Sequence, residues 1–309
     1  MPENTQIINK AVTTDSVTYG LLNPGQARQF IQQTFDATNL RPLVRHEIRL
    51  ERAGEVDKIG IASRILRSKV ENTDDGYRAS PNFDAITYQT TPVRLPWEIT
   101  EETLRENIEG EGFENIVTNF MTTQLGIDME DLDLNGDTET ADTDEDYDFL
   151  KVNDGWVKQL TAGSNIVDRS TVDDGAMSLD VFYSAIKALP NKYNNGKLRW
   201  IMSPHRYQDW IYTLLQSAVS NGGIITDKRI EDPASIPVIQ CANLSDDKII
   251  LTDPKNLIEV TTYGVKIRKT IEGKHAIMED KRFYVVHLDF DPIIEELDAA
   301  CLITGLAEI

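Results

Sequence analysis

The stretch FENIVTNFMTTQLGIDMEDLDLNGD, residues 113–137, sets the pattern from which the rest of the fold follows. Its apolar side chains recur at spacings of three and four, which predicts one long amphipathic helix. The stripe consists of Phe113, Ile116, Val117, Phe120, Met121, Leu125, Met129 and Leu132. About twenty residues at 1.5 Å each give a helix roughly 30 Å long.

The end of this stretch also has the pattern of a calcium loop. In DLDLNGDTETAD, residues 131–142, acids or an amide fill positions 1, 3 and 5, and glycine fills the sharp-turn position 6. The candidate ligands are Asp131, Asp133, Asn135, Asp137 and Asp142. Against calcium, Thr138 replaces an aliphatic residue and position 12 is not Glu. Alternatively, Asn135 and Gly136 end the helix in a left-handed conformation with no metal. Any bound calcium would have a stabilising role.

Composition favours a globular, non-enzymatic protein. The 309 residues are 40% hydrophobic and 27% charged, and no signal peptide or apolar run of about 18 residues occurs, so we expect a soluble chain made in the cytoplasm. Cys241 and Cys301 stand in apolar surroundings, which predicts buried free thiols. No nucleophile elbow, phosphate loop, zinc-protease motif or dinucleotide fingerprint is present. The four histidines are scattered, so we predict no catalysis.

The net charge of -20 is unevenly distributed. Residues 128–154 hold twelve acids against one lysine, whereas residues 41–70 are rich in bases. These bases are Arg41, Arg45, Arg49, Arg52, Lys58, Arg64, Arg67 and Lys69. An acidic chain is a poor direct binder of nucleic acid. Two interpretations are open: the acidic and the basic cluster are each a solvated face, or the two clusters meet across a contact between subunits.

The order of elements predicts an α+β fold. A helix begins at Asn23–Pro24, and residues 46–95 are extended around a polar middle that has too little apolar surface for its own core. FLKVNDGWVKQL, residues 149–160, is typical of a strand and turn. Two helices, begun at Ser178 and at Ser203–Pro204, flank the buried strand LRWIM, and strands fill most of residues 236–304.

This order resembles the major capsid proteins of tailed bacteriophages with the HK97-type fold. GLLNPGQARQFI, residues 20–31, is similar to the end of the family's N-terminal arm, and residues 46–95 resemble its extended E-loop. ITEETLRENI with residues 113–137 resembles the short helix and the spine helix. Residues 179–215 resemble the opening of the A-domain. ASIPVIQCANLSDDKIILTDPKNL matches a further family section, although Ser235 and Ile236 stand where a glycine is usual.

The resemblance implies five segments. They are an N-terminal arm with a short amphipathic helix (1–45), a two-stranded E-loop (46–97), a P-domain with spine helix and acidic loop (98–175), an A-domain (176–262) and C-terminal strands returning to the P-domain (263–309).

The implied function is that of a structural virion protein. Such a subunit self-assembles, in the host cytoplasm, into hexamers and pentamers of an icosahedral shell around double-stranded DNA, without sequence-specific contact and without a membrane. Portal, scaffold and decoration proteins are the implied partners. The charge pattern adds a hypothesis, in which basic residues of the E-loop lie against an acidic neighbour, with residues 128–148 one candidate. These residues are Arg49, Arg52, Arg64, Arg67 and Lys69.

Two other functions remain open at this point. Encapsulins share the fold but form cargo-loaded nanocompartments, and fold alone does not separate them from viral shells. The long arm and long E-loop favour the virus. The remaining alternative is a monomeric calcium-binding module.

Overall fold

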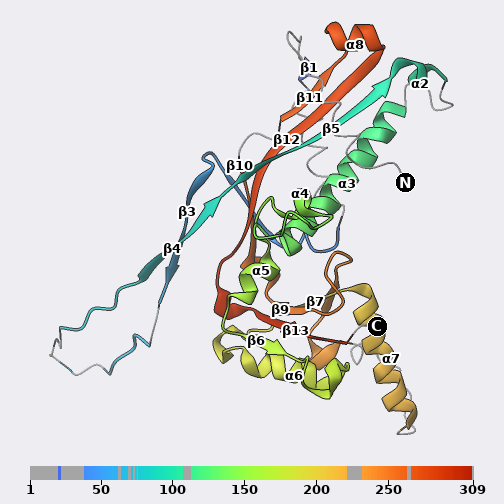
Figure 1. Ribbon diagram of the computed structural model, residues 1–309. Helices are drawn as coiled ribbons and strands as arrows, with labels where there is room; N and C mark the ends of the chain where they lie inside the picture. Colours follow the sequence, from blue (N-terminus) through green and yellow to red (C-terminus); the bar gives the residue numbers. More distant parts are fainter. Residues whose placement is uncertain are drawn as a thin grey trace.

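The computed structural model describes residues 20–21, 38–61, 64–68, 71, 74, 76–106, 113–220, 232–262 and 266–307. Figure 1 shows an elongated body from which a two-stranded hairpin projects to one side. The helix predicted after Asn23 lies outside the described residues. Within the described part of the chain, no helix is both long and apolar enough to cross a bilayer.

One 14-residue strand, β12 (Lys281–Ile294), organises the long sheet. One of its edges pairs antiparallel with β5 (Thr91–Thr100) over ten residues. The other edge pairs with β11 (Lys266–Thr270) and then with β10 (Leu257–Thr262). The outer strands β1 (Gly20–Leu21) and β2 (Arg45–Arg49) pair with β11 and β10. The short helix α8 (Lys274–Glu279) lies between β11 and β12 in the chain.

Helix α3 (Phe113–Asn135) packs on this sheet, and the long helix predicted from the apolar stripe is therefore present. Leu125, Met129 and Leu132 are buried against sheet residues such as Phe290. Phe120 belongs to the same stripe but is 70% exposed, so the N-terminal half of the stripe is not all core. The short helix α2 (Glu101–Glu106) precedes α3 and is capped by Thr100, whose Oγ1 accepts from Thr103 N at 3.2 Å.

The small sheet has five strands, two helices and its own core. Phe182 of α6 lies edge-on to Trp200 at 4.9 Å and to Trp210 of α7 at 5.0 Å between ring centroids. Figure 1 shows α6 and α7 at the end of the body remote from α8. The strands, in spatial order, are β6 (Ile166–Asp168), β13 (Cys301–Thr304), β9 (Ile249–Thr252), β7 (Arg199–Met202) and β8 (Val238–Gln240). The helices are α6 (Leu179–Ala188) and α7 (Pro204–Ser220).

A third cluster of buried side chains joins the two sheets. At its centre Trp156 is fully buried, and its indole Nε1 donates to Ile293 O at 3.2 Å. Trp156 belongs to α5 (Trp156–Thr161), which follows α4 (Tyr147–Leu150), so the strand predicted within residues 149–160 is wrong, whereas a turn is present after α4. Trp156, Val157 and Leu160 are buried at helical spacing, a signal too short to outweigh the apparent strand pattern.

The turn after α3 needs glycine for space rather than for a left-handed backbone. Gly136 is not among the described residues with positive φ, so the predicted left-handed helix end is wrong. Gly136 N instead continues the helical pattern by donating to Leu132 O at 3.0 Å. A Cβ on Gly136 would lie 2.5 Å from Asn153 O and 2.7 Å from Leu132 O. The chain of residues 153–155 therefore packs directly on the end of the helix.

The predicted segments 176–262 and 263–309 do not each stay within one sheet. β10, at the end of the first segment, lies in the long sheet, whereas β13, in the second, lies in the small sheet between β6 and β9. β10 (LIEVTT) and β13 (CLIT) are both mainly apolar and buried, so the sequence pattern does not reveal which sheet each one joins.

Candidate assembly surfaces

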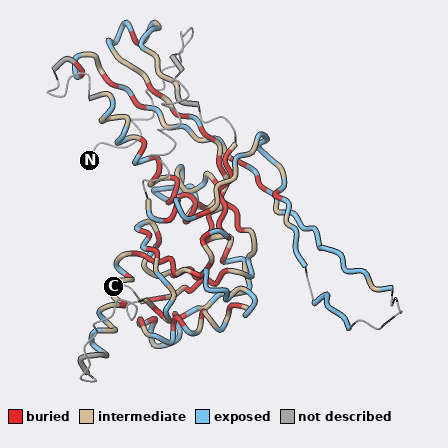
Figure 2. The backbone as a smooth tube through the Cα atoms, turned by 180° about the vertical axis from the view of Figure 1, so that it is seen from behind, coloured by how far each residue is buried: buried red, intermediate tan, exposed pale blue. Residues whose placement is uncertain are grey.

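The hairpin arm, defined here as residues 53–89, is the least buried described part of the molecule. Its strands β3 (Ala53–Gly60) and β4 (Asn82–Gln89) pair from Ala53↔Gln89 to Gly60↔Asn82 and form a sheet of two strands alone. Figure 2 shows exposed backbone along most of the projection. An isolated two-stranded sheet is at best marginally stable in water. The arm is therefore suited to lie on a surface that this chain does not itself supply.

The outer part of the arm carries large apolar side chains in solvent. The clearest cases are Ile59 (68% exposed), Ile61 (61%), Leu66 (93%) and Phe83 (71%). Single exposed apolar residues are ordinary on protein surfaces, but a group of them on one thin projection marks an interaction site.

The base of the arm is seated on the long sheet. Val56 and Tyr88 are buried against Ile258, Val260 and Ile293. Polar contacts lie beside this seat: Lys58 forms an ion pair with Glu296, and Arg52 Nε donates to Asp289 Oδ2 at 2.8 Å. The base is thus held in place, while the outer half has no support from the described residues.

The five predicted interface bases fall into different environments. Arg49 lies 3.3 Å from Glu47, and Arg52 is paired with Asp289, so both have partners within their own chain. Arg64 is exposed on the arm, and the Arg67 guanidinium lies 3.7 Å from the ring centroid of Tyr77. Lys69 lies outside the described residues. Their contact with a neighbour stays a prediction.

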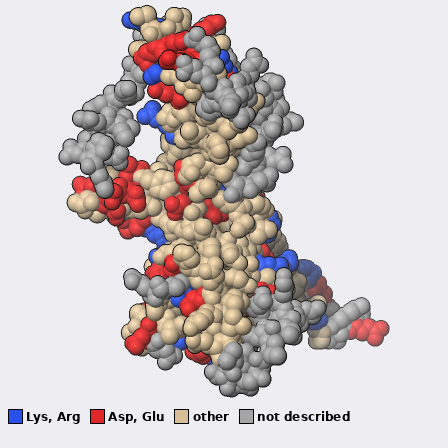
Figure 3. All heavy atoms as spheres, turned by 90° about the vertical axis from the view of Figure 1, so that its right-hand side faces the viewer, with Lys and Arg blue, Asp and Glu red and all other residues tan. Residues whose placement is uncertain are grey.

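The acidic loop after α3 is an exposed surface. Figure 3 shows Asp and Glu side chains gathered about half-way along one face of the molecule. Exposed acids of the loop are Asp142, Asp144, Glu145, Asp146 and Asp148. Lys158 lies 2.5 Å from Asp137 and 3.0 Å from Asp154, and the Lys158 ammonium, with the backbone N–H of Glu139, holds the pKa of Asp137 below its usual value. One lysine therefore neutralises only part of the loop.

The candidate calcium ligands do not converge. Asp131, Asp133 and Asn135 belong to the last turns of α3, and Asn135 Nδ2 donates to Asp131 Oδ1 at 2.7 Å. Asp133 is fully buried, and Asp142 is exposed. Among the described residues, no three His, Cys, Asp or Glu side chains are arranged to hold a metal ion. Calcium binding stays a prediction for which titration is the test.

Sequence reasoning missed a buried charge cluster at the junction of the two sheets. Arg41 Nη2 donates to both carboxylate oxygens of Glu259 at 2.8 Å, and both side chains are fully buried. His46 Nε2 donates to Arg41 O at 2.8 Å. Although burial opposes its ionisation, the Arg41 guanidinium keeps the pKa of Glu259 below its usual value. Burial and the adjacent Glu259 raise the pKa of Asp133 well above its usual range.

A second acid extends this cluster toward the small sheet. Glu130 of α3 accepts from Leu40 N at 3.3 Å and from the Cys241 thiol at 3.0 Å. Burial raises the pKa of both Cys241 and Cys301, and the predicted buried free thiols are confirmed. The cluster joins residues 40–46, α3, the segment after β8, and β10. The sequence did not predict this cluster because its members are far apart along the chain, and each charged residue taken alone resembles a surface charge.

Comparisons with known proteins show which proteins share this fold. No family model matches the sequence. A presumed prophage capsid protein, YqbE of Bacillus subtilis (strain 168), is 28% identical over 328 residues, which cover 99% of this chain and 99% of that protein. The satellite phage P4 procapsid, solved with its size determination (Sid) protein, matches with a TM-score of 0.69 and 15% identity, over 99% of this chain and 98% of that chain.

The chain has the fold of the phage capsid proteins. The resemblance predicted from the sequence is thereby confirmed. A further match is the holo-SrpI encapsulin of Synechococcus elongatus PCC 7942, with a TM-score of 0.54 and 11% identity over 99% of this chain and 96% of that one. The phage capsid fold is therefore shared with a shell of a different kind, as expected.

Proposed function

We propose that this chain is a structural shell subunit that acts by self-assembly. The observation that carries the proposal is the hairpin arm. Its base is seated on the long sheet, and its outer end carries exposed apolar side chains that do not contact the core of the same subunit. Burial of one large apolar side chain contributes roughly 1.5–3 kcal/mol, so several such residues on a neighbour give a strong contact. In a closed symmetric assembly every subunit both gives and receives that contact.

In its finer form, the proposal is a major capsid subunit of hexamers and pentamers in an icosahedral shell around double-stranded DNA. The prophage relative and the phage procapsid support this form over others. The net charge of -20 is compatible with DNA as cargo, because a shell wall without net attraction lets DNA slide. Portal, scaffold and decoration proteins are the corresponding partners, and the virion is the location.

Charge complementarity between copies is a second part of the proposal. With Arg49 and Arg52 paired internally, the exposed Arg64 is the described arm residue best placed to meet an acidic neighbour. The exposed acids of residues 142–148 are the matching surface. Reversal of charge at Arg64 and Arg67 should lower particle yield and change its salt sensitivity. Unchanged yield and salt response would remove this part of the proposal.

The first test is electron microscopy and light scattering of the purified chain, compared with an arm-shortened variant. Gly60 pairs with Asn82, so residues 61–81 can be replaced by an Asn-Gly turn that closes the hairpin. We expect shells, rings or tubes from the natural chain and free subunits from the variant. The variant's melting temperature should stay close to that of unassembled natural chain, because the removed residues belong to no core cluster. Assembly that is indifferent to the shortening would contradict the proposed role of the arm.

An encapsulin-type compartment is the second candidate, favoured by the match to the SrpI encapsulin. Its distinguishing prediction is genomic: a cargo enzyme gene beside this one, in place of portal and terminase genes. The contents of shells isolated from the natural source give the biochemical answer, since protein cargo and packaged DNA are separated by nuclease and protease digestion after opening.

A further inference from the structure

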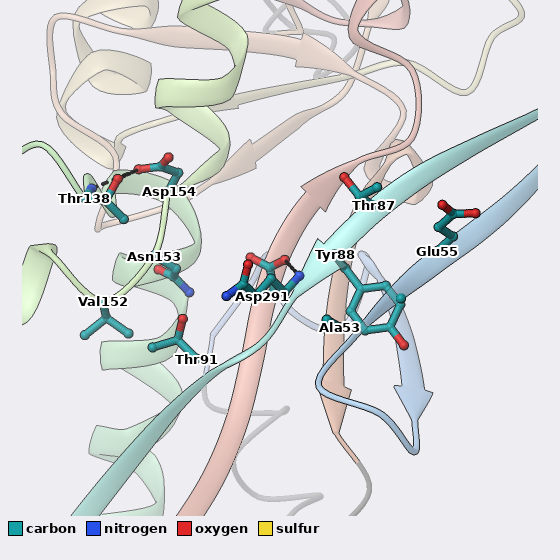
Figure 4. Close-up of a pocket in the computed structure, with 12 residues that line it drawn as sticks. Ala53, Glu55, Thr87, Tyr88, Thr91, Thr138, Val152, Asn153, Asp154 and Asp291 are labelled. Carbon is teal, nitrogen blue, oxygen red and sulfur yellow. Dashed lines mark hydrogen bonds between the residues drawn. The ribbon is translucent and has the colours of Figure 1, made fainter.

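A pocket of about 770 Å³ opens where the hairpin arm leaves the body. The arm forms one wall through residues 53–55 and 87–89, and residues 138 and 152–154 form the other. Figure 4 shows Asp291 of β12 between the walls, with Asn153 and Thr91 on one side and Tyr88 and Glu55 on the other. The charged residues that line the pocket are Glu55, Asp154 and Asp291, all acids.

Asp291 is a charge without a counter-charge. Its Oδ2 accepts from Gln89 N at 2.8 Å, but no Lys, Arg or His of the described chain forms an ion pair with it. Two residues earlier on the same strand, Asp289 has such a partner in Arg52. Burial raises the pKa of Asp291 to about 6, opposed by the Gln89 N–H, and Asp154 adds to the rise. At neutral pH the folded subunit therefore carries a half-buried carboxylate at a cost.

Asn153 is an independent sign of a missing ligand. Its side chain is only 4% exposed, yet neither Oδ1 nor Nδ2 has a hydrogen-bond partner among the described residues. The amide lies against the pocket and is turned toward Asp291 (Figure 4). A buried amide in a native protein is normally hydrogen-bonded, and a 180° rotation about its last torsion presents either its donor or its acceptor.

We propose that this pocket receives a guanidinium or ammonium side chain from a second copy of the chain. The cation completes the charge of Asp291 and donates to the Asn153 amide oxygen. Charge complementarity supports a second copy as the source: the hairpin arm of each subunit carries Arg64 in solvent, in the part of the arm beyond the last paired residues Gly60 and Asn82. The inference rests on the proposed function, because only an assembly brings the copies together.

The test is Asp291→Asn, compared in free subunits and in assembled shells separated by sedimentation. Asparagine keeps the oxygen that accepts from Gln89 N and removes only the charge. In free subunits at pH 8 we expect a higher melting temperature, because the ionised Asp291 shares the pocket with the acids Glu55 and Asp154. In shells we expect the opposite effect, an association between subunits that is roughly tenfold weaker. The readout is the urea concentration at which light scattering falls to half, which should be lower for the variant than for the natural chain.

A second variant and a control make the outcome decisive. Asn153→Ala removes no hydrogen bond of the described chain and should also weaken the shell, so the proposal does not depend on one substitution folding well. Glu272→Gln makes the same charge change at an exposed residue near α8, outside the pocket, and should leave urea dissociation unchanged.

The opposed signs separate the alternatives. A raised melting temperature with unchanged shell stability means a water-filled pocket only and overturns the inference, while the proposed function stands. A lowered melting temperature of the free subunit means that the chain fills its own pocket, which also overturns it. A natural chain that never assembles overturns the inference together with the proposed function.

Discussion

Replacement of Arg41 by methionine should destabilise the subunit severely. Methionine has similar length but no charge, so Glu259 stays buried beside Asp133 without its guanidinium partner. The two 2.8 Å bonds from Arg41 and the complete burial of both side chains place the pair in the class whose disruption costs about 3–5 kcal/mol. Domain stabilities are roughly 5–15 kcal/mol, so the loss is a large share of the total.

The pH dependence gives this prediction its sharpest form. In the natural chain the pKa of Glu259 is lowered, so the pair contributes stability above the usual Glu value of 4.5 and loses it as the pH falls below. Without Arg41, burial is the largest influence on Glu259 and raises its pKa, opposed by His46 and by the hydrogen bond from Asp133. The penalty is then greatest near pH 7.5 and shrinks toward pH 5.5, where the acid takes up a proton.

Urea unfolding of the free subunit at these two pH values is the assay. Arg41→Lys is the matched control, because it keeps the charge but loses the two-pronged bond, and should cost less than Arg41→Met. Adding Glu259→Gln to Arg41→Met should restore part of the loss. A loss below about 1 kcal/mol, or one that is the same at both pH values, would refute the account of the cluster as a desolvated ion pair.

Two further predictions concern packing. Gly136→Ala should lower the free energy of unfolding in urea by roughly 1–3 kcal/mol or more, because its Cβ meets backbone atoms at 2.5 and 2.7 Å. The control Gly60→Ala, whose Cβ has no atom within 4 Å, should be nearly neutral. Equal effects of the two substitutions would contradict the close-approach explanation. Cys241 and Cys301 should react with an aromatic disulfide reagent only after unfolding, since both thiols are buried and burial raises the pKa of Cys301 to about 12. Rapid labelling of the native chain would show that the small sheet opens.

Local patterns predicted local structure well. The stripe of residues 113–132 predicted α3, and Ser203 predicted the start of α7, where its Oγ accepts from Arg206 N at 3.1 Å. Ser178 precedes α6 as predicted, but its hydroxyl makes no capping bond. Spacing and hydrogen-bonding chemistry act over a few residues, which is why such boundaries are readable from sequence.

Features made by distant segments were not predictable in this way. Arg41 and Glu259 are 218 residues apart, and nothing in either neighbourhood marks them as a buried pair. Asp291 lies within β12, and the pocket around it needs the arm and residues 152–154 together. Arg52 was predicted to face a neighbour, which stays a prediction, and its pairing with Asp289 within the same chain was not foreseen.

The position of β12 near the end of the chain also governs when a subunit becomes complete. β2 and β5 find their sheet partners in β10 and β12, more than 180 residues later in the sequence. At roughly 5–20 residues per second, the early strands wait on the order of ten seconds to a minute during synthesis for these partners. Until then the hairpin lacks Ile258 and Ile293, on which it is seated. A chain that ends before β10 and β12 therefore lacks the residues on which its arm is seated.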